Sequence, residues 1–258
     1  MLATGYDREP ESPNHQRSQP IMPFTRRDVL SKMAFGTALF TTPGLFAEEL
    51  MRTAQVGEGP FYPDKLPLDT DNDLLLLNDS ITPAVGNVTH LTGRVRNVKG
   101  DPIRNAFVEI WQVDGNGVYI HSDSSDSEKR DKNFQGYGRF LTSIRGDYYF
   151  RTVKPIAYPG RTPHIHIGVS LNGHRIFTSQ ILVKANKEAN QKDGLFKQIK
   201  DQKVRDTILC DFKPLKGSKI GELTANFDII LGITAEENAD GTVKGVGKPD
   251  RVTRRKLR

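Results

Sequence analysis

From Glu48 onward, the chain consists of short runs in which hydrophobic and polar residues alternate, separated by Gly, Asn, Asp and Pro. A period of two is typical of half-buried strands, and repeated turn residues between such runs indicate a sandwich or barrel. "HLTGRVRN" and "AFVEIWQV" predict two strands joined by the turn "KGDPIRN", and "GRFLTSIRGDYYFRTV" predicts a hairpin around Arg145 to Asp147. The pattern therefore predicts an all-β fold, an antiparallel β-sandwich.

The later part of the chain adds a third hairpin, one more strand and one helix. "HIHIGVSLNGHRIFTSQILV" contains Asn-Gly, the preferred two-residue hairpin turn, and "ANFDIILGI" predicts a further strand. "DGLFKQIKDQKVRDTILC" predicts a single helix in the C-terminal half, because it carries an apolar stripe. Residues 64–88 and 120–135 have no clear period and are predicted to be long loops, which in compact domains are often functional.

The N-terminal segment differs in composition from the rest. "MLATGYDREPESPNHQRSQPI" is polar and aperiodic, as in a disordered leader, and Met22 could be the true start. After it, Arg26 and Arg27 precede a short apolar segment and small residues up to Ala47, an order that resembles a twin-arginine export signal. The alternative is an amphipathic helix that stays on the protein. We expect an exported, periplasmic or extracellular protein, or a cytoplasmic one if the signal is not functional.

Three regions are predicted: leader and signal over residues 1–47, a β-sandwich domain over 48–246, and a basic tail over 247–258. The net charge of +6 comes largely from the tail "RVTRRKLR", which lacks aromatic residues for base stacking, so no nucleic-acid partner is expected. No run of 18 apolar residues exists, so no stable membrane span is expected. A single cysteine, Cys210, excludes a disulfide framework and multi-cysteine metal sites.

Candidate metal chemistry is concentrated in "YPGRTPHIHIGVS". His164 and His166 are two residues apart on a predicted strand, so their side chains leave the same face and can converge on one ion. Taken alone, such a pair is more often one solvent-facing histidine and one core histidine. Arg161 adds a permanent cation, and Tyr158 adds a phenol that could act as a hard oxygen donor.

No Asp or Glu lies near this motif, so the usual ferrous arrangement of two histidines and one carboxylate lacks its anion. "WQVDGNGVYIHSD" offers Tyr119 instead. Two tyrosinates with two neutral histidines favour Fe(III), since a phenol with a pKa near 10 ionises only beside a strong Lewis acid. On spacing alone, Tyr119 is better explained as a core aromatic residue with its hydroxyl at the edge.

The ordered set "EGPFYPD", "GRVRNVKGDPIRNAFVEIWQVDGNGVYIHSD", "NFQGYGRFLTSIRGDYYFRTVKPIAYPGRTPHIHIGVS" and "TSQILV" resembles the intradiol ring-cleavage dioxygenases. Within them it is most similar to the iron-binding subunit of protocatechuate 3,4-dioxygenase, from about Glu58 to Val183. The resemblance implies an antiparallel β-sandwich with Fe(III) among loops at one side. By this resemblance, the four iron ligands of the family correspond to Tyr119, Tyr158, His164 and His166.

The resemblance also implies the reaction: both atoms of O2 enter a catecholic substrate, and the ring opens between its hydroxyl-bearing carbons to a muconate-type diacid. Tyr158 would leave the metal and accept a substrate proton, Arg161 would stabilise the anionic ring, and Gln180 would orient Arg161 or the substrate. One departure is that only "PG" separates Tyr158 from Arg161, which puts the pocket size and the accepted diol in question. His121 lies outside the ligand set and is expected to be a solvated loop residue.

Alternatives remain at this point. "GRVRNVKGDPIRNAFVEIW" also suits a non-catalytic sandwich of the transthyretin-like or carboxypeptidase-regulatory type, and a ferrous extradiol oxygenase is a second rival. "EGPFYPD" is expected either to line the pocket entrance or to form a rigid Pro-flanked loop. The oligomeric state and any partner subunit are left open.

Overall fold

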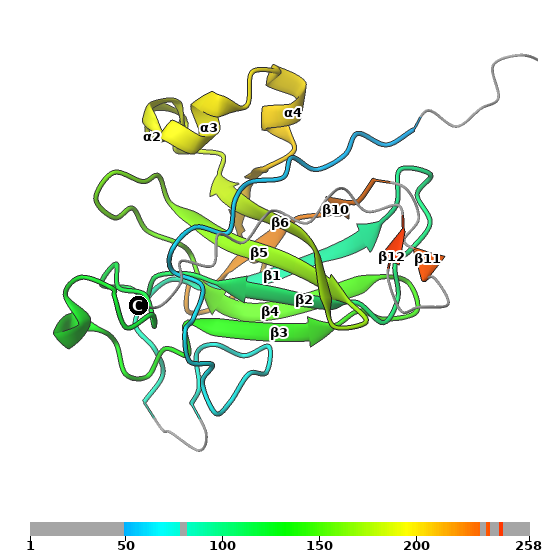
Figure 1. The fold of residues 1–258 in the computed structure, drawn as a ribbon. Helices are drawn as coiled ribbons and strands as arrows, with labels where there is room; N and C mark the ends of the chain where they lie inside the picture. The colour runs from blue at the N-terminus through cyan, green and yellow to red at the C-terminus, as the bar shows by residue number, and fades with distance from the viewer. Residues whose placement is uncertain (1–48, 78–81, 233–235, 238–242, 245–258) are drawn as a thin grey trace, which may run out of the picture. The chain divides into compact units, whose positions relative to one another are not determined.

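A computed structural model describes residues 49–77, 82–232, 236–237 and 243–244 (Figure 1). The predicted leader, export signal and basic tail lie outside these described residues. The strands are β1 Val88–Arg96, β2 Phe107–Trp111, β3 Tyr137–Leu141, β4 Asp147–Val153, β5 His164–Leu171, β6 His174–Val183, β7 Leu209–Cys210, β8 Phe212–Pro214, β9 Leu223–Asn226, β10 Ile229–Ile230, β11 Glu236–Glu237 and β12 Val243–Lys244. The helices are α2 Lys187–Lys192, α3 Gly194–Gln198 and α4 Gln202–Asp206, with a 3-10 turn at Ser127–Lys129.

Two five-stranded sheets form the body of the protein (Figure 1). One has the order β10-β1-β9-β8 with β4 also paired to β1, and the other has the order β3-β2-β5-β6-β7. Leu91 and Phe150 from the first sheet share one buried cluster with Val108 and Ile167 from the second. The sheets therefore pack face to face, and the predicted β-sandwich is confirmed. It is mixed rather than wholly antiparallel, because β1 pairs in parallel with β9 and β10, as does β6 with β7.

The hairpin of β5 and β6 forms as predicted. Asn172 and Gly173 have φ values of 49° and 78°, the left-handed pair that a type I′ turn requires. The register of the sheet places Gln180 opposite His166 on one side and Trp111 opposite His166 on the other. Pairing within this sheet thus places Trp111, His166 and Gln180 side by side on three neighbouring strands.

Two predicted strand arrangements are wrong. The segment around Arg145 is not a hairpin, because β3 pairs with β2 in one sheet and β4 pairs with β1 in the other. The predicted strand "ANFDIILGI" is divided into β9 and β10, where Asp228 accepts a hydrogen bond from the backbone N–H of Arg94. Alternation reports which face of a strand is buried, whereas its pairing partner depends on the rest of the fold.

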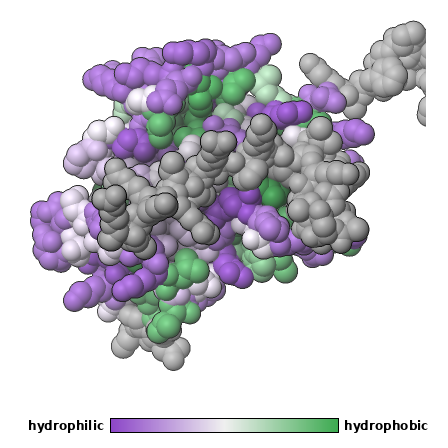
Figure 2. All heavy atoms as spheres, viewed as in Figure 1, coloured by the Kyte–Doolittle hydropathy of each residue, from purple (hydrophilic) through white to green (hydrophobic). Residues whose placement is uncertain are grey.

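The single helix predicted over residues 193–210 is wrong: this segment holds two short helices, α3 and α4, and ends in β7, and a third short helix, α2, precedes it. Asp193 and Asp201 each accept hydrogen bonds from two backbone N–H groups at the start of a new helix, which interrupts a continuous one. The apolar side chains of the segment still pack together, since Phe196 and Ile208 are buried with Leu182. Hydrophilic residues gather on the outside of this region, at the top of Figure 2. Within the described ranges, no helix is long and apolar enough to cross a membrane.

Candidate metal centre

Strand β5 places His164 and His166 on the same buried face. Each side chain is 1% exposed, and their Nε2 atoms lie 3.2 Å apart. The Nδ1 atom of His164 lies 2.6 Å from the carbonyl oxygen of Thr162, which can only accept. His164 therefore carries its proton on Nδ1 and presents the lone pair of Nε2 to the centre.

Tyr119 is held against these histidines by a tight turn. The buried carboxylate of Asp114 accepts hydrogen bonds from the backbone N–H groups of Asn116 at 2.8 Å and Val118 at 3.0 Å. The N–H of Tyr119 donates to Ser124 Oγ at 3.0 Å. The Tyr119 hydroxyl lies 2.9 Å from His166 Nε2 and 3.3 Å from His164 Nε2. The turn "DGNG" thus aims the phenol at the histidine pair.

These three donor atoms have the spacing of ligands around one ion. Atoms bound to a metal at about 2.0–2.1 Å lie roughly 3 Å from one another, as the Tyr119 and histidine atoms do. The described residues include no cluster of three His, Cys, Asp or Glu side chains able to hold a metal. A metal centre built on His164 and His166 would therefore draw on the neighbouring phenols for further donors.

Burial sets the protonation states of His164, His166 and Tyr119. It lowers the pKa of His164 to about 4 and that of His166 well below its ordinary value, with the charge of Arg161 acting in the same direction, so both imidazoles are neutral. Burial, followed by the neighbouring Tyr158, raises the pKa of Tyr119 well above 10. Tyr119 can therefore ionise only with a strong cation beside it, and the residues present fit a highly charged, hard metal ion.

Tyr158 and Arg161 are joined by a two-residue turn. Arg161 N–H donates to the carbonyl of Tyr158 at 2.9 Å, and Gly160 has φ +80°, so Pro159 and Gly160 occupy the central positions of a type II turn. The Tyr158 ring is 5.5 Å from the ring of Tyr119 and 5.6 Å from that of His164. The short "PG" segment thus holds a phenol and a guanidinium side by side at the centre.

We expect Gly160→Ala to lower the free energy of unfolding by about 1 kcal/mol, since a side chain in the left-handed region is strained. Gly194→Ala is the matched control, because a Cβ at either glycine meets no atom within 4 Å and Gly194 has no positive φ. The control should be neutral or slightly stabilising. Urea unfolding of both variants measures the difference, and equal stability of the two would contradict the turn assignment.

Arg161 is fixed on two sides. Its Nη2 donates to Gln180 Oε1 at 2.6 Å, and its Nε donates to Asp193 Oδ2 at 2.8 Å. Gln180 Nε2 in turn lies 3.5 Å from His166 Nδ1. The structure therefore brings together all of the residues that the sequence analysis singled out for the site: Tyr119, Tyr158, Arg161, His164, His166 and Gln180.

Aromatic rings that the sequence analysis did not assign to the site enclose it. Phe61 stacks on Tyr119 with ring centroids 4.9 Å apart, and Trp111 stacks on His166 at 4.9 Å. Phe61 belongs to "EGPFYPD", for which lining the pocket entrance was one of the two expected roles, although no single residue of it was assigned. His121 lies at the rim, with its ring 6.0 Å from Phe61 and its Nδ1 accepting the N–H of Asp123.

A buried carboxylate, Glu109, supports these rings from behind. It accepts hydrogen bonds from the hydroxyls of Tyr62 at 2.9 Å and Tyr137 at 2.5 Å, and its other oxygen pairs with Arg175 at 2.7 Å. Burial alone would raise the pKa of Glu109, but Arg175 and the two hydroxyls outweigh it and hold the pKa below its usual value. The Arg175 guanidinium also lies over the ring of Trp111, at 5.6 Å. The stack behind His166 is therefore fixed by an ionised, fully partnered carboxylate.

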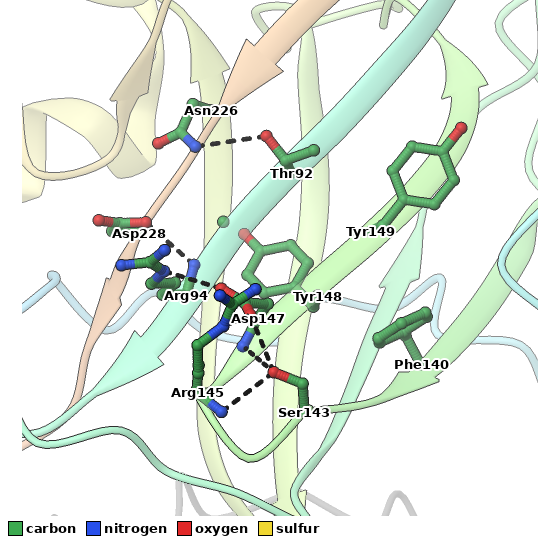
Figure 3. Close-up of a pocket in the computed structure, with 11 residues that line it drawn as sticks. Thr92, Arg94, Phe140, Ser143, Arg145, Asp147, Tyr148, Tyr149, Asn226 and Asp228 are labelled. Atoms are coloured by element: carbon green, nitrogen blue, oxygen red, sulfur yellow. Dashed lines mark hydrogen bonds and ion pairs between the residues drawn. The ribbon is translucent and has the colours of Figure 1, made fainter.

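A hollow of about 590 Å³ on the other sheet is a separate feature (Figure 3). Three of its charged side chains are paired within it, since Asp147 accepts from Arg94 at 2.7 Å and from Arg145 at 3.0 Å. None of the predicted site residues lines it. The candidate metal centre lies elsewhere, between the loops and β5.

Comparison with known proteins gives the family that the sequence motifs resemble. The family model described as dioxygenase matches residues 57–232. The beta chain of protocatechuate 3,4-dioxygenase from Burkholderia cepacia is 43% identical over 149 residues, which are 55% of this chain and 63% of that protein. Catechol 1,2-dioxygenase from Acinetobacter baylyi is 30% identical over 51% of this chain and 46% of that protein. The chain thus spans less than two thirds of the length of either relative.

Solved structures agree on the fold. An intradiol ring-cleavage dioxygenase from Tetranychus urticae superimposes with a TM-score of 0.56 at 22% identity, over 70% of this chain and 95% of that chain. The dioxygenase domain of a carbohydrate-binding fusion protein from a Streptomyces species gives 0.53 at 24% identity, over 70% and 99%. With the family model covering most of the described residues, the chain belongs to the intradiol ring-cleavage dioxygenases.

Proposed function

We propose that the protein is a non-haem Fe(III) dioxygenase that cleaves a catecholic diol between its two hydroxyl-bearing carbons. The observation that carries this proposal is the convergence of Tyr119 Oη with the Nε2 atoms of His164 and His166, at separations of 2.9–3.3 Å. Tyr158 would be the fourth ligand. Two phenolates and two neutral imidazoles carry two negative charges, a donor set that suits a ferric ion.

When bound, the ferric ion would supply Lewis acidity and an acceptor for electron density from the diol. The protein side chains supply the remaining functions. Tyr158, half-buried beside the centre, would take a diol proton on its Oη as the substrate binds. Arg161, with 20% of its side chain exposed, presents a permanent cation that would stabilise negative charge on the ring during the reaction. The buried rings of Trp111 and Tyr119 exclude water behind the reacting atoms.

The substrate class proposed is a small catecholic diol. The similarity to a protocatechuate 3,4-dioxygenase beta chain supports protocatechuate as a first compound to test. The two-residue turn between Tyr158 and Arg161 is the feature of this chain that would set its own preference, since the backbone between these residues is held in a tight turn beside the proposed diol site.

The experiment is oxygen uptake by the iron-loaded protein with a panel of catechol, protocatechuate, hydroxyquinol and chlorinated catechols. We expect at least one diol to consume one O2 per molecule of ring-opened product. If no diol consumes oxygen while the protein retains a visible phenolate-to-iron absorption band, the metal centre stands and the proposed reaction does not. A colourless protein that takes up no iron would instead favour a non-catalytic sandwich module.

A further inference from the structure

Asp193 is the least exposed charged group around Arg161. It lies between α2 and α3, and its side chain is 1% exposed. Its Oδ2 accepts from Arg161 Nε at 2.8 Å and from the backbone N–H of Thr162 at 3.2 Å. Its Oδ1 accepts from the backbone N–H groups of Leu195 at 2.9 Å and Phe196 at 3.1 Å. All four partners are donors, so the position requires a group that only accepts hydrogen bonds.

These contacts join the helical segment to the turn that carries Arg161. Thr162 adds a second link, because its hydroxyl donates to Asn190 Oδ1 at 2.6 Å and Asn190 donates to the carbonyl of Val183 at 3.0 Å. A free arginine side chain samples many rotamers, and a guanidinium held on one edge alone can still swing. Because Asp193 holds the Nε edge and Gln180 holds the Nη2 atom, the Arg161 guanidinium is restricted to one orientation.

We propose that Asp193 is a positioning residue for the reaction: by holding the Nε edge of Arg161, it aims the guanidinium at the site of the bound diol. This inference rests on the proposed function, since the diol is the group that Arg161 would serve. It gives α2 and α3 a role in catalysis, although both lie outside the metal centre. The pKa of Asp193, which burial alone would raise but the Arg161 hydrogen bond holds below its usual value, agrees with a permanently ionised carboxylate.

The test compares Asp193→Asn with Asp201→Asn in the iron-loaded full chain. Both aspartates accept from two backbone N–H groups at the start of a five-residue helix, but the Asp201 carboxylate accepts only from the N–H groups of Lys203 and Val204 within the described part of the chain. Asparagine at position 193 must turn its NH2 group toward either Arg161 or the helix N–H groups, which are themselves donors. Loss of the negative charge at a helix N-cap is common to both variants, because asparagine can still cap a helix, whereas loss of the Arg161 contact is specific to Asp193→Asn.

We expect Asp193→Asn to lower kcat/KM by about 10- to 100-fold, since a small misplacement of a catalytic group has effects of this size. Asp201→Asn should change it less than about twofold. Crystal structures should show Arg161 detached from Gln180 in Asp193→Asn and unmoved in Asp201→Asn. In an Arg161→Lys background, Asp193→Asn should cause little further loss, because its effect passes through the guanidinium.

Three results would overturn the proposal: an unmoved Arg161 in Asp193→Asn, equal losses in the two variants, or the same loss in the Arg161→Lys background as in the Arg161 protein. If the wild-type protein turns over no diol, the proposed function fails by itself. The crystal structures then still decide whether Asp193 positions Arg161.

Discussion

Replacing Tyr119 by Phe is expected to lower kcat/KM for the diol by roughly 100-fold or more, since changes to residues that only support metal ligands already cost 10- to 100-fold. The substitution removes the one oxygen that lies within 3.3 Å of both histidine Nε2 atoms. It leaves the ring, and hence the stacking with Phe61, in place. Oxygen uptake, iron content per chain and the visible absorption band measure the effect.

Tyr148→Phe is the matched control for this substitution. Tyr148 is also a buried tyrosine, and its hydroxyl donates to the carbonyl of Phe227 at 2.5 Å. The control removes a buried hydroxyl without touching the centre, so it should lower stability and leave iron content unchanged. If Tyr119→Phe retained wild-type iron content and activity, Tyr119 would be only a core aromatic residue.

Replacing Glu109 by Ala should cause the largest loss of stability. Its carboxylate is the shared acceptor for Tyr62, Tyr137 and Arg175, so its removal takes the acceptor from the hydroxyl of a buried tyrosine, from that of a half-buried tyrosine and from a cation. Breaking a buried ion pair costs about 3–5 kcal/mol, and the lower end applies because Arg175 keeps Glu58 at 2.8 Å. We expect the Tm to fall by roughly 6–12 °C in a thermal scan followed by circular dichroism.

Asp211→Ala is the control for the loss of an ion pair at the surface. Asp211 lies 3.7 Å from Lys184, and both side chains are about half exposed (48% and 55%). Such pairs contribute little, so the Tm should hardly change. If the Glu109→Ala protein has the same Tm as the Asp211→Ala protein, the Glu109 carboxylate does not support the Trp111 stack.

The residues of the candidate metal centre could be proposed from the sequence because the relevant constraints are local or carried by motifs. The two-residue spacing of His164 and His166 fixes a common face on any strand. The short "PG" segment was noted as a departure from the family, and the structure shows that it forms a tight turn between Tyr158 and Arg161. Tyr119 was different, since its spacing favoured a core role and only the family resemblance pointed to the site.

The features that the sequence analysis missed depend on partners that are distant in the chain. The predicted helical segment begins at Asp193, but the contact of the Asp193 carboxylate with Arg161 joins residues 32 apart. Similarly, Glu109 and Arg175 are 66 residues apart and meet only through the sheet. Strand partners were misassigned around Arg145 for the same reason, because alternation is a property of one strand and pairing is a property of the fold.

The most direct test of the central claim is the identity of the product that the iron-loaded wild-type protein forms from a diol under 18O2. A catecholic substrate should yield a muconate-type diacid in which both labelled atoms are retained, identified by mass and absorbance. A semialdehyde formed by cleavage beside the diol, or a quinone formed with no oxygen incorporated, would contradict the account.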